Sequence, residues 1–536
     1  MKGLDPLGVQ QPCIAVYSSL LPGITNVTDR VAYYGFGPWL TWTFAQRNPR
    51  STVSEFIEML RRAEVLLTLI GVRHAVTTSD DHFEEHGGTL IGVNTLRKIA
   101  EEAKANDVIR LSNYTIQKDS PKRYFKNRRG GLGQYYLGVL RDEYKLLDTT
   151  GRAINFTIER GQPMAQQVAA GVNGDYFFRC IEKGEIKLRD LDELCSFCPC
   201  QLRTAGRATE RELLLDTVLG RRAELSENPA PRRQSLALLI DFLRAGAGCK
   251  ITREPMDEFL IGCYSAVLPS GKKWSAARLL GATKALWAFY VRAELYSLAM
   301  QRLFREALSA IEVESPEVHS IELSGGWCAE SKEFTAAIKR LSAKTYADLL
   351  TQIRKSIPPL DTIGNARHEI SLLKDVREPE SASRGIEAAA KMIVTLLVRS
   401  PDGPKSVEEA IGPDGIRLQY YPINIDTIAK RSRDQWEKMT VSAWMADAIT
   451  WILLTHRQVA FRKLSQSGDD TRRFRLGDSG FYFEGDMIDV ARTLPRLRPA
   501  FRFLRDLGLV ERADDSRLPI PTKAGLEFLE QVANAA

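Results

Sequence analysis

Apolar residues recur every three or four positions along most of this chain, which is the spacing of a helix with one buried face. Strand-like runs are short, so the predicted fold class is mainly α. The aromatic run from Ala32 to Phe44 is expected to pack in a core. The predicted helices are Ser54–Leu69, Asn94–Ala105, Glu210–Leu219, Arg233–Leu243, Ala276–Ile311, Thr335–Ile357, Ile386–Val398 and Thr440–Leu464.

The C-terminal sequence LPRLRPAFRFLRDLGLVERADDSRLPIPTKAGLEFLEQV carries the most specific pattern. It predicts a helix from about Arg496 to Leu507 that ends at Gly508, then two short strands around an Asp-Asp-Ser turn. Thr522 is expected to cap the last helix. This order resembles winged-helix domains of the multiple-antibiotic-resistance-regulator type, whose pattern runs helix, LGLV, charged hairpin, T-x-x-G and helix. The resemblance covers roughly the last 60 to 100 residues, with Asp486–Leu494 as the expected upstream helix.

Residues 90–172 contain a similar order of parts, so a second winged helix there is a hypothesis. In YYLGVLRDEYKLLDTTGRAINFTIERG, the triplet Leu140-Arg141-Asp142 matches Leu504-Arg505-Asp506. Thr157 and Gly161 fall near the positions of Thr522 and Gly525, with an offset of about one residue. Asp-Glu-Tyr replaces Asp-Leu-Gly at the helix end, so chance agreement is the alternative.

The length of 536 residues exceeds one ordinary core, so several domains are expected. We predict an N-terminal domain over 1–205, which includes the possible winged helix at 90–172. A helical scaffold domain over 206–400 follows. Residues 401–536 are expected to form a helical segment and the C-terminal winged helix. The Pro- and Gly-rich sequence Arg399–Ser406 marks the second boundary.

Composition indicates a soluble protein, with 44% hydrophobic and 26% charged residues. No apolar run is long enough to span a bilayer, and the N-terminal sequence lacks a signal-peptide pattern. Eight cysteines in a chain of this length are not a disulfide scaffold. We therefore expect a cytoplasmic protein with reduced thiols and no membrane partner.

The net charge of +7 is small, but it is concentrated in one place. Six basic residues and one acidic residue lie between Lys118 and Gly130, just before a predicted helix. Backbone N–H groups at a helix start attract phosphate, which makes this segment a candidate nucleic-acid contact. A solvated loop, or a loop that pairs with an acidic partner, is the alternative. The expected contact residues are Lys122, Arg123, Lys126, Arg128, Arg129, Gln134 and Arg141.

In the C-terminal copy, Arg498, Arg502 and Arg505 are expected on one helix face, opposite Leu497, Phe501 and Leu504. Such a row of arginines suits contacts with phosphate or guanine. Eight basic and six acidic residues between Val490 and Ala536 nearly balance. A structural or protein-binding role is therefore the alternative for this helix.

The sequence CSFCPC places Cys195, Cys198 and Cys200 together, and a C-x-x-C pair is typical of zinc ligation. Cys180, His82 or His86 would have to supply a fourth ligand through the fold. Buried free cysteines without metal are the alternative. The sequence suggests no cofactor other than this structural zinc. The segment from His82 to His86 carries the letters of an inverted zincin motif, with Glu85 as general base, but its surroundings favour a polar loop.

The chain has no complete phosphate-binding glycine motif. We predict a non-enzymatic DNA-associated or scaffolding subunit of a larger prokaryotic assembly, in genome (antiviral) defence or DNA processing, with DNA and other protein subunits as partners. A pure protein-interaction subunit is one alternative, by architectural analogy with the kleisin-type proteins that bridge ATPases. A metal-dependent hydrolase or nuclease that uses His82, Glu85, His86 or the cysteines is the other.

Overall fold

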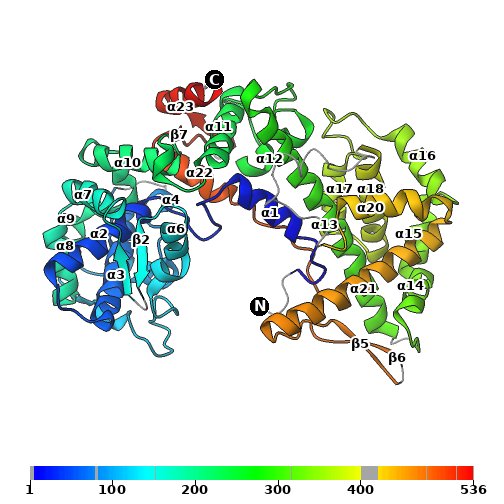
Figure 1. Ribbon diagram of the computed structural model, residues 1–536, viewed down its shortest axis with the longest axis horizontal. Helices are drawn as coiled ribbons and strands as arrows, with labels where there is room; N and C mark the ends of the chain where they lie inside the picture. Colours follow the sequence, from blue (N-terminus) through cyan, green and yellow to red (C-terminus); the bar gives the residue numbers. More distant parts are fainter. Residues whose placement is uncertain are drawn as a thin grey trace. The chain divides into compact units, whose positions relative to one another are not determined.

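The computed structural model describes residues 5–78, 83–150, 153–314, 317–399, 421–478, 480–514 and 516–534. It is mainly helical, as predicted, with small two-stranded antiparallel hairpins (Figure 1). None of the helices in the described ranges has the length and apolar character needed to cross a membrane. The predicted domain boundary near 400 falls in residues 400–420, which lie outside the described residues.

The chain forms two compact units, each assembled from separate segments. Unit 1 comprises Met1–Ser19, Arg253–Ala276 and Gly281–Pro495, and unit 2 comprises Leu20–Thr252, Ala277–Leu280 and Arg496–Ala536. The chain therefore starts in unit 1, continues into unit 2, returns to unit 1 for most of its middle part and ends in unit 2. The predicted boundaries at 205 and 400 stay a prediction.

Unit 1 is built around the long helix α13, which packs against α12, α17 and α18. Among the elements of unit 1, only α1 extends into unit 2, by its C-terminal residue. The elements are α1 (Gln11–Leu20), α12 (Pro255–Ser265), α13 (Gly281–Glu314), α14 (Ile321–Glu330), α15 (Lys332–Leu341), α16 (Tyr346–Ser356), α17 (Glu369–Arg377), α18 (Ala382–Arg399), α20 (Ile425–Asp434), η9 (Trp436–Lys438), α21 (Val441–Ser467), β5 (Phe474–Gly477) and β6 (Gly480–Phe483).

Two sequence predictions fail in unit 1. The single helix predicted over Thr335–Ile357 is wrong, because Ser342 adopts a left-handed φ of 56° that ends α15, and Thr345 caps a new helix, α16. The helix predicted over Asp486–Leu494 is also wrong, because this segment has no regular secondary structure. Its Thr493 N–H and hydroxyl donate to Glu294 on α13 over 2.7 and 2.8 Å, which takes the place of helical hydrogen bonds.

Unit 2 contains both copies of the pattern predicted from the sequence. Its elements are α2 (Ala32–Arg47), α3 (Val53–Thr77), α4 (Phe83–His86), α5 (Val93–Glu102), β1 (Ile109–Arg110), η1 (Leu111–Asn113), η2 (Leu132–Tyr136), α6 (Leu137–Asp142), β2 (Leu147–Thr150), β3 (Ala153–Phe156), α7 (Gly161–Gly171), α8 (Gly174–Lys183), β4 (Glu185–Ile186), α9 (Leu188–Glu193), η3 (Cys195–Phe197), η4 (Pro199–Arg203), η5 (Ala205–Arg207), α10 (Ala208–Val218), η6 (Ala223–Leu225), α11 (Pro229–Ala245), η7 (Arg278–Leu280), α22 (Leu497–Asp506), β7 (Val510–Glu511), β8 (Ile520–Pro521) and α23 (Lys523–Ala533).

Helix α2 is the core element of unit 2, as the aromatic run predicted. Tyr33, Tyr34 and Trp39 are at most 1% exposed, and α2 packs along α7 and against β3. Burial of these large rings supplies much of the apolar area that holds the unit together.

The first copy joins helix, hairpin and helix through one hydrogen-bonded junction. Lys145 has a φ of 51°, and the next residue, Leu146, donates its N–H to Leu140 O over 2.8 Å. Thr157 N–H donates to Leu146 O over 3.2 Å, and its hydroxyl donates to Lys145 O over 2.6 Å. The same hydroxyl oxygen accepts the N–H of Gly161 over 2.9 Å, at the start of α7.

The C-terminal copy repeats these hydrogen bonds, with spacings that differ by one residue at two points. Gly508 has a φ of 75°, and Leu509 donates its N–H to Leu504 O over 2.8 Å. Thr522 N–H donates to Leu509 O over 2.9 Å, and its hydroxyl donates to Gly508 O over 2.8 Å. The Thr522 hydroxyl oxygen accepts the N–H of Gly525 over 3.2 Å. The two segments thus form the same local structure, and their membership of the winged-helix family stays a prediction.

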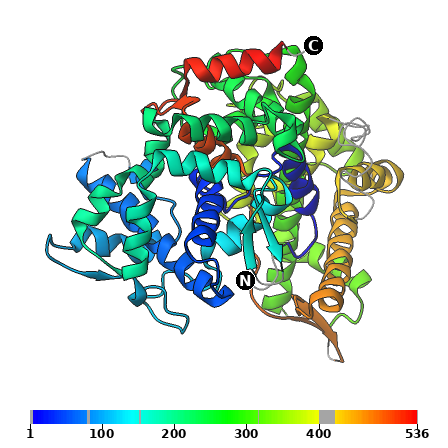
Figure 2. The ribbon, with the colours of Figure 1, turned by 60° about the vertical axis from the view of Figure 1, so that its left-hand side comes forward.

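Each copy also has a preceding helix that packs on its last helix and returning strand. In the first copy this helix is α2, against α7 and β3, and in the second it is α11, against α23 and β8. Both Figures 1 and 2 show α23 lying along α11, although nearly 280 residues separate them. The segment after α11 also joins the hairpin, since Leu518 N–H donates to Cys249 O over 3.0 Å. Most of unit 1 is therefore inserted in the chain between α11 and α22 of the second copy, which explains why the upstream helix of this copy does not lie at Asp486–Leu494.

A test of the shared junction uses its two glycines. A Cβ at Gly161 or Gly525 would lie 2.2 Å from a backbone carbonyl oxygen, so Gly161→Ala and Gly525→Ala should each destabilise the protein by about 1–3 kcal/mol. Gly138→Ala on α6 is the matched control, because its Cβ meets nothing within 4 Å, and it should be neutral or stabilising by up to about 1 kcal/mol. Urea denaturation of the three variants measures this, and equal stabilities would show that the junction is not tightly packed.

Candidate metal centre and nucleic-acid interface

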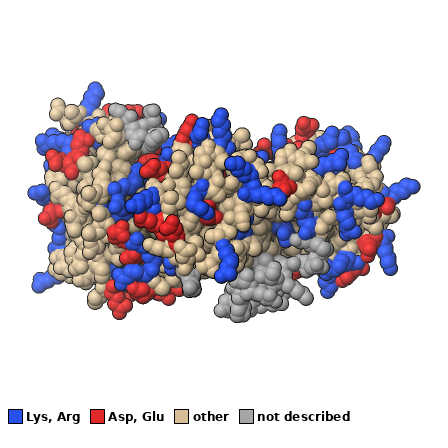
Figure 3. Space-filling model, turned by 90° about the horizontal axis from the view of Figure 1, so that it is seen from above, with Lys and Arg blue, Asp and Glu red and all other residues tan. Residues whose placement is uncertain are grey.

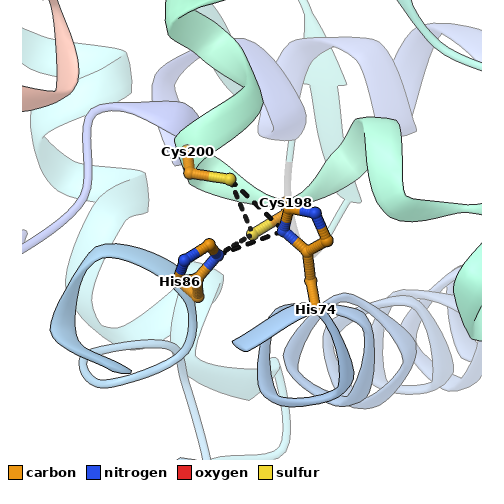
Figure 4. A group of neighbouring side chains, drawn as sticks. All are labelled: His74, His86, Cys198 and Cys200. Carbon is orange, nitrogen blue, oxygen red and sulfur yellow. Dashed lines mark hydrogen bonds between the residues drawn. The ribbon is translucent and has the colours of Figure 1, made fainter. Parts of the chain in front are cut away.

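Four potential metal ligands converge in unit 2, and we name them the His–Cys cluster (Figure 4). The Nδ1 atoms of His74 and His86 are 3.1 Å apart, and the sulfur atoms of Cys198 and Cys200 are 3.4 Å apart. Cys198 Sγ lies 3.4 Å from His86 Nδ1, and Cys200 Sγ lies 3.3 Å from His74 Nδ1. All four ligand atoms fall within 4.8 Å of one another. His86 and Cys198 are buried, so the cluster is largely enclosed.

The histidines meet because two helices approach closely at glycine residues. His74 lies in the last turn of α3, and His86 is the last residue of α4. A Cβ on Gly71 of α3 would lie 3.1 Å from His86 O, and a Cβ on Gly87 would lie 3.1 Å from Val72 N. Glycine has no Cβ, so these two positions allow the backbones to approach closely, and the two imidazole rings come together.

Arg30 fixes the position of α4. Its guanidinium is 1% exposed and donates to the carbonyl oxygens of Glu84 and Glu85 over 2.8 and 2.9 Å. It also donates to both carboxylate oxygens of Asp506 over 3.0 and 2.9 Å, a bidentate pair. One buried cation therefore joins the end of α22 to the short helix that carries His86.

The cysteines are held at the junction of η3 and η4. Cys198 precedes Pro199, the first residue of η4, so only one residue separates the two sulfur-bearing positions. Arg207 donates to Ser196 O over 3.2 Å and forms a buried pair with Glu210, which anchors this junction. Burial raises the pKa of the Cys198 thiol well above its ordinary value. The hydrogen bond with Cys198, and then those with His74 and His86, lower the pKa of Cys200, so negative charge is favoured there.

The structure brings together some of the ligands considered from the sequence. Cys198, Cys200 and His86 belong to the His–Cys cluster, whereas Cys195 does not, because the turn of η3 separates it from the other two sulfurs. Cys180 lies on α8 outside the cluster, and burial raises the pKa of its thiol to about 11. The proposed ligand His82 lies outside the described residues. His74 was missed, since nothing in its local sequence distinguishes it from other residues of a long amphipathic helix.

The basic segment before α6 is anchored by two buried side chains of α3. Arg61 donates to the backbone carbonyl oxygens of Thr115, Phe125 and Asn127 over 3.1, 3.1 and 2.6 Å. The segment from 115 to 127 is therefore fixed at three points along its backbone before any ligand binds.

Glu64 occupies the start of the helix that follows the basic segment. Its carboxylate accepts the N–H groups of Gly131 and Leu132 over 3.0 and 2.5 Å and the hydroxyl of Tyr124 over 2.5 Å. Burial raises the pKa of Glu64 to about 7, while these hydrogen bonds and the charge of Arg61 oppose the rise. The backbone N–H groups that the sequence suggested for a phosphate are thus taken by the protein's own carboxyl group.

Several cations of this segment remain accessible. Among the residues that the structure describes, the side chains of Lys122, Lys126 and Arg128 are exposed and form no ion pair. The half-buried rings of Phe125 and Tyr135 meet edge to face, with centroids 5.2 Å apart. We name this set, with the residues that flank it, the basic–aromatic surface. It consists of Lys118, Lys122, Arg123, Phe125, Lys126, Arg128, Arg129, Gln134, Tyr135 and Arg141.

Other predicted contacts in the first copy have partners within the chain. Arg123 forms an ion pair with Asp119 and donates to the carbonyl oxygen of Lys126. Arg141 pairs with its neighbour Asp142 over 2.7 Å, and Arg129 is half-buried. Gln134 is exposed on the outer side of η2, as the sequence predicted.

The C-terminal copy presents a different surface. Arg502 of α22 pairs with Asp29 over 2.5 Å and with Glu84 over 3.1 Å. Burial lowers the pKa of Arg505, which lies near Glu85 and Asp506. Of the three arginines predicted to contact nucleic acid, only Arg498 is exposed. The reason is that α22 lies beside acidic residues of the same unit, with Asp29 and Glu84 against Arg502 and Glu85 near Arg505.

A test of the anchored segment compares two adjacent arginines. Arg61→Met removes three hydrogen bonds from buried carbonyl groups and leaves Glu64 without its neighbouring cation, so we expect a loss of about 3–5 kcal/mol. Arg62→Met, whose side chain is 27% exposed and pairs with Glu58, should cost at most about 1 kcal/mol. Denaturation and limited trypsin cleavage between Lys118 and Arg129 report the effect. Equal cleavage in the two variants would contradict the anchoring role of Arg61.

Two features of unit 2 thus offer chemistry, the His–Cys cluster and the basic–aromatic surface. In the face seen in Figure 3, basic and acidic side chains lie next to one another over much of the surface. The exposure of individual cations is therefore a better guide to a candidate binding surface than the net charge of the chain. No family model, no curated protein and no solved structure matches the chain.

Proposed function

We propose that this chain is a non-enzymatic, DNA-associated subunit that contacts its nucleic acid through the basic–aromatic surface of the first copy. The proposal rests on three exposed cations, Lys122, Lys126 and Arg128, which form no ion pair with the residues that the structure describes and lie on an anchored backbone. Phosphate contacts by such cations supply most of the affinity of proteins for DNA.

The neighbouring side chains suit this role. Gln134 lies on the outer side of the helix and can present its amide to a base edge, as glutamine does with adenine. Phe125 and Tyr135 provide ring surface beside the cations, on which an unpaired base can stack. Because Arg61 and Glu64 already fix the segment, binding would cost little conformational entropy.

In this proposal the C-terminal copy has a packing role. Arg502 and Arg505 are engaged with acidic residues of unit 2, and exposing them to DNA would require these pairs to break. Glu85, the general base of the zincin-like pattern, forms an ion pair with Arg203. This pairing argues against a general-base role for its carboxylate.

The test is duplex binding by the full chain as a function of salt. The triple variant Lys122→Glu, Lys126→Glu, Arg128→Glu should bind at least about ten-fold more weakly, and its salt slope should fall by about 3, one for each lost phosphate contact. Arg498→Glu on α22 is the matched control and should keep the wild-type affinity and slope.

Two outcomes would contradict the proposal. Unchanged affinity in the triple variant would remove the basic–aromatic surface from the interface. A wild-type chain that binds no duplex at low salt would leave a pure protein-interaction subunit as the function, the alternative that the sequence also favours.

A further inference from the structure

We infer that His74, His86, Cys198 and Cys200 bind one zinc ion that fastens three separate segments of unit 2. The inference is independent of the proposed function, because these four side chains lie apart from the residues of the basic–aromatic surface. It concerns the type of the donor atoms, their spacing and their places in the fold.

The donor set matches a structural zinc site. Two cysteine sulfurs and two histidine nitrogens form one of the usual tetrahedral combinations for zinc. A square-planar or oxygen-preferring ion would need other ligands, since Mg²⁺ and Ca²⁺ select carboxylate, carbonyl and water oxygens.

The spacing of the donors also fits a zinc ion. With Zn–S bonds of about 2.3 Å and Zn–N bonds of about 2.0–2.1 Å, the ligand atoms of a tetrahedron lie about 3.3–3.8 Å from one another. Four of the six pairs in the His–Cys cluster measure 3.1, 3.3, 3.4 and 3.4 Å, and no pair exceeds 4.8 Å. The longest separation exceeds the tetrahedral values by at most about 1 Å, so side-chain movements of about half an ångström would complete the coordination.

The competing explanation is a hydrogen-bonded group of thiols and neutral imidazoles. In such a group each N–H or S–H can donate to only one acceptor. Here, however, each Nδ1 atom faces both the other Nδ1 and a sulfur atom. Four lone-pair-bearing atoms directed at one enclosed point are better satisfied by a single cation than by the few protons available.

The site would be structural rather than catalytic. All four positions of a tetrahedron are filled by protein ligands, so none is left for a reactive water. The ligands come from the last turn of α3, from α4 and from the η3–η4 junction, with up to 126 residues between them. Arg30 joins α4 to Asp506, and α22 packs on η4. The ion would therefore also stabilise the packing of the C-terminal copy within unit 2.

The experiment measures metal in the purified full chain. Elemental analysis should find one zinc per chain in the wild type, and less than about a tenth of that in the double variant Cys198→Ser, Cys200→Ser. Cys195→Ser is the matched control, because it changes the same CSFCPC sequence at a sulfur outside the cluster, and it should retain full zinc. A wild-type chain without zinc, or a Cys195→Ser variant that loses zinc, would overturn the inference.

A second measurement covers the case in which the double variant does not fold. The wild-type chain, stripped of metal by a chelator and given Co²⁺, should show thiolate-to-cobalt charge transfer and the intense d–d bands of a tetrahedral site. Its thermal unfolding temperature should fall on chelation and return with Zn²⁺, since a ligand that binds only the folded state stabilises it. A Co²⁺ spectrum of an octahedral ion with no thiolate band would contradict the site.

Discussion

The structure of unit 2 depends on a few buried cations that join segments far apart in the chain. Arg30 is the clearest case, because its guanidinium donates four hydrogen bonds, two to backbone carbonyls of α4 and two to the carboxylate of Asp506 on α22. A charge buried to 1% exposure is tolerated only when it is fully hydrogen-bonded, so both ends of the chain must fold together to form this site. Arg61 applies the same constraint to the basic segment, with three backbone carbonyls as its acceptors.

Unit 2 is completed by segments that lie before and after most of unit 1 in the chain. The second helix–hairpin–helix copy takes its preceding helix, α11, from before the insertion and its remaining elements from after it. The junction built by Gly508, Leu509 and Thr522 is the same as that built by Lys145, Leu146 and Thr157. Local backbone geometry is therefore repeated, while the surfaces differ. The first copy leaves cations such as Lys122, Lys126 and Arg128 exposed, whereas Arg502 of the second copy is paired with acidic residues of unit 2.

Much of this fold could be predicted from the sequence, because helical periodicity and turn residues are local signals. Helices α3, α10, α13, α18 and α21 fall near their predicted positions, and so do both hairpins. The break at Ser342 was missed because the apolar period continues across it, although Thr345 and Asp348 form a capping box there. Long-range features could not be predicted. The approach of His74 to Cys200, and of Glu64 to the start of the helix at Leu132, depends on how α3 packs, which no local pattern of residues records.

We propose that the first copy contacts nucleic acid and that the C-terminal copy does not. Amide hydrogen exchange of the full chain, with and without a short DNA duplex, distinguishes the two copies in one experiment. We predict slower exchange on DNA binding in residues 111–142, around the basic–aromatic surface, and unchanged exchange in α22 and the β7–β8 hairpin. Slower exchange confined to α22 and that hairpin, with residues 111–142 unaffected, would contradict it.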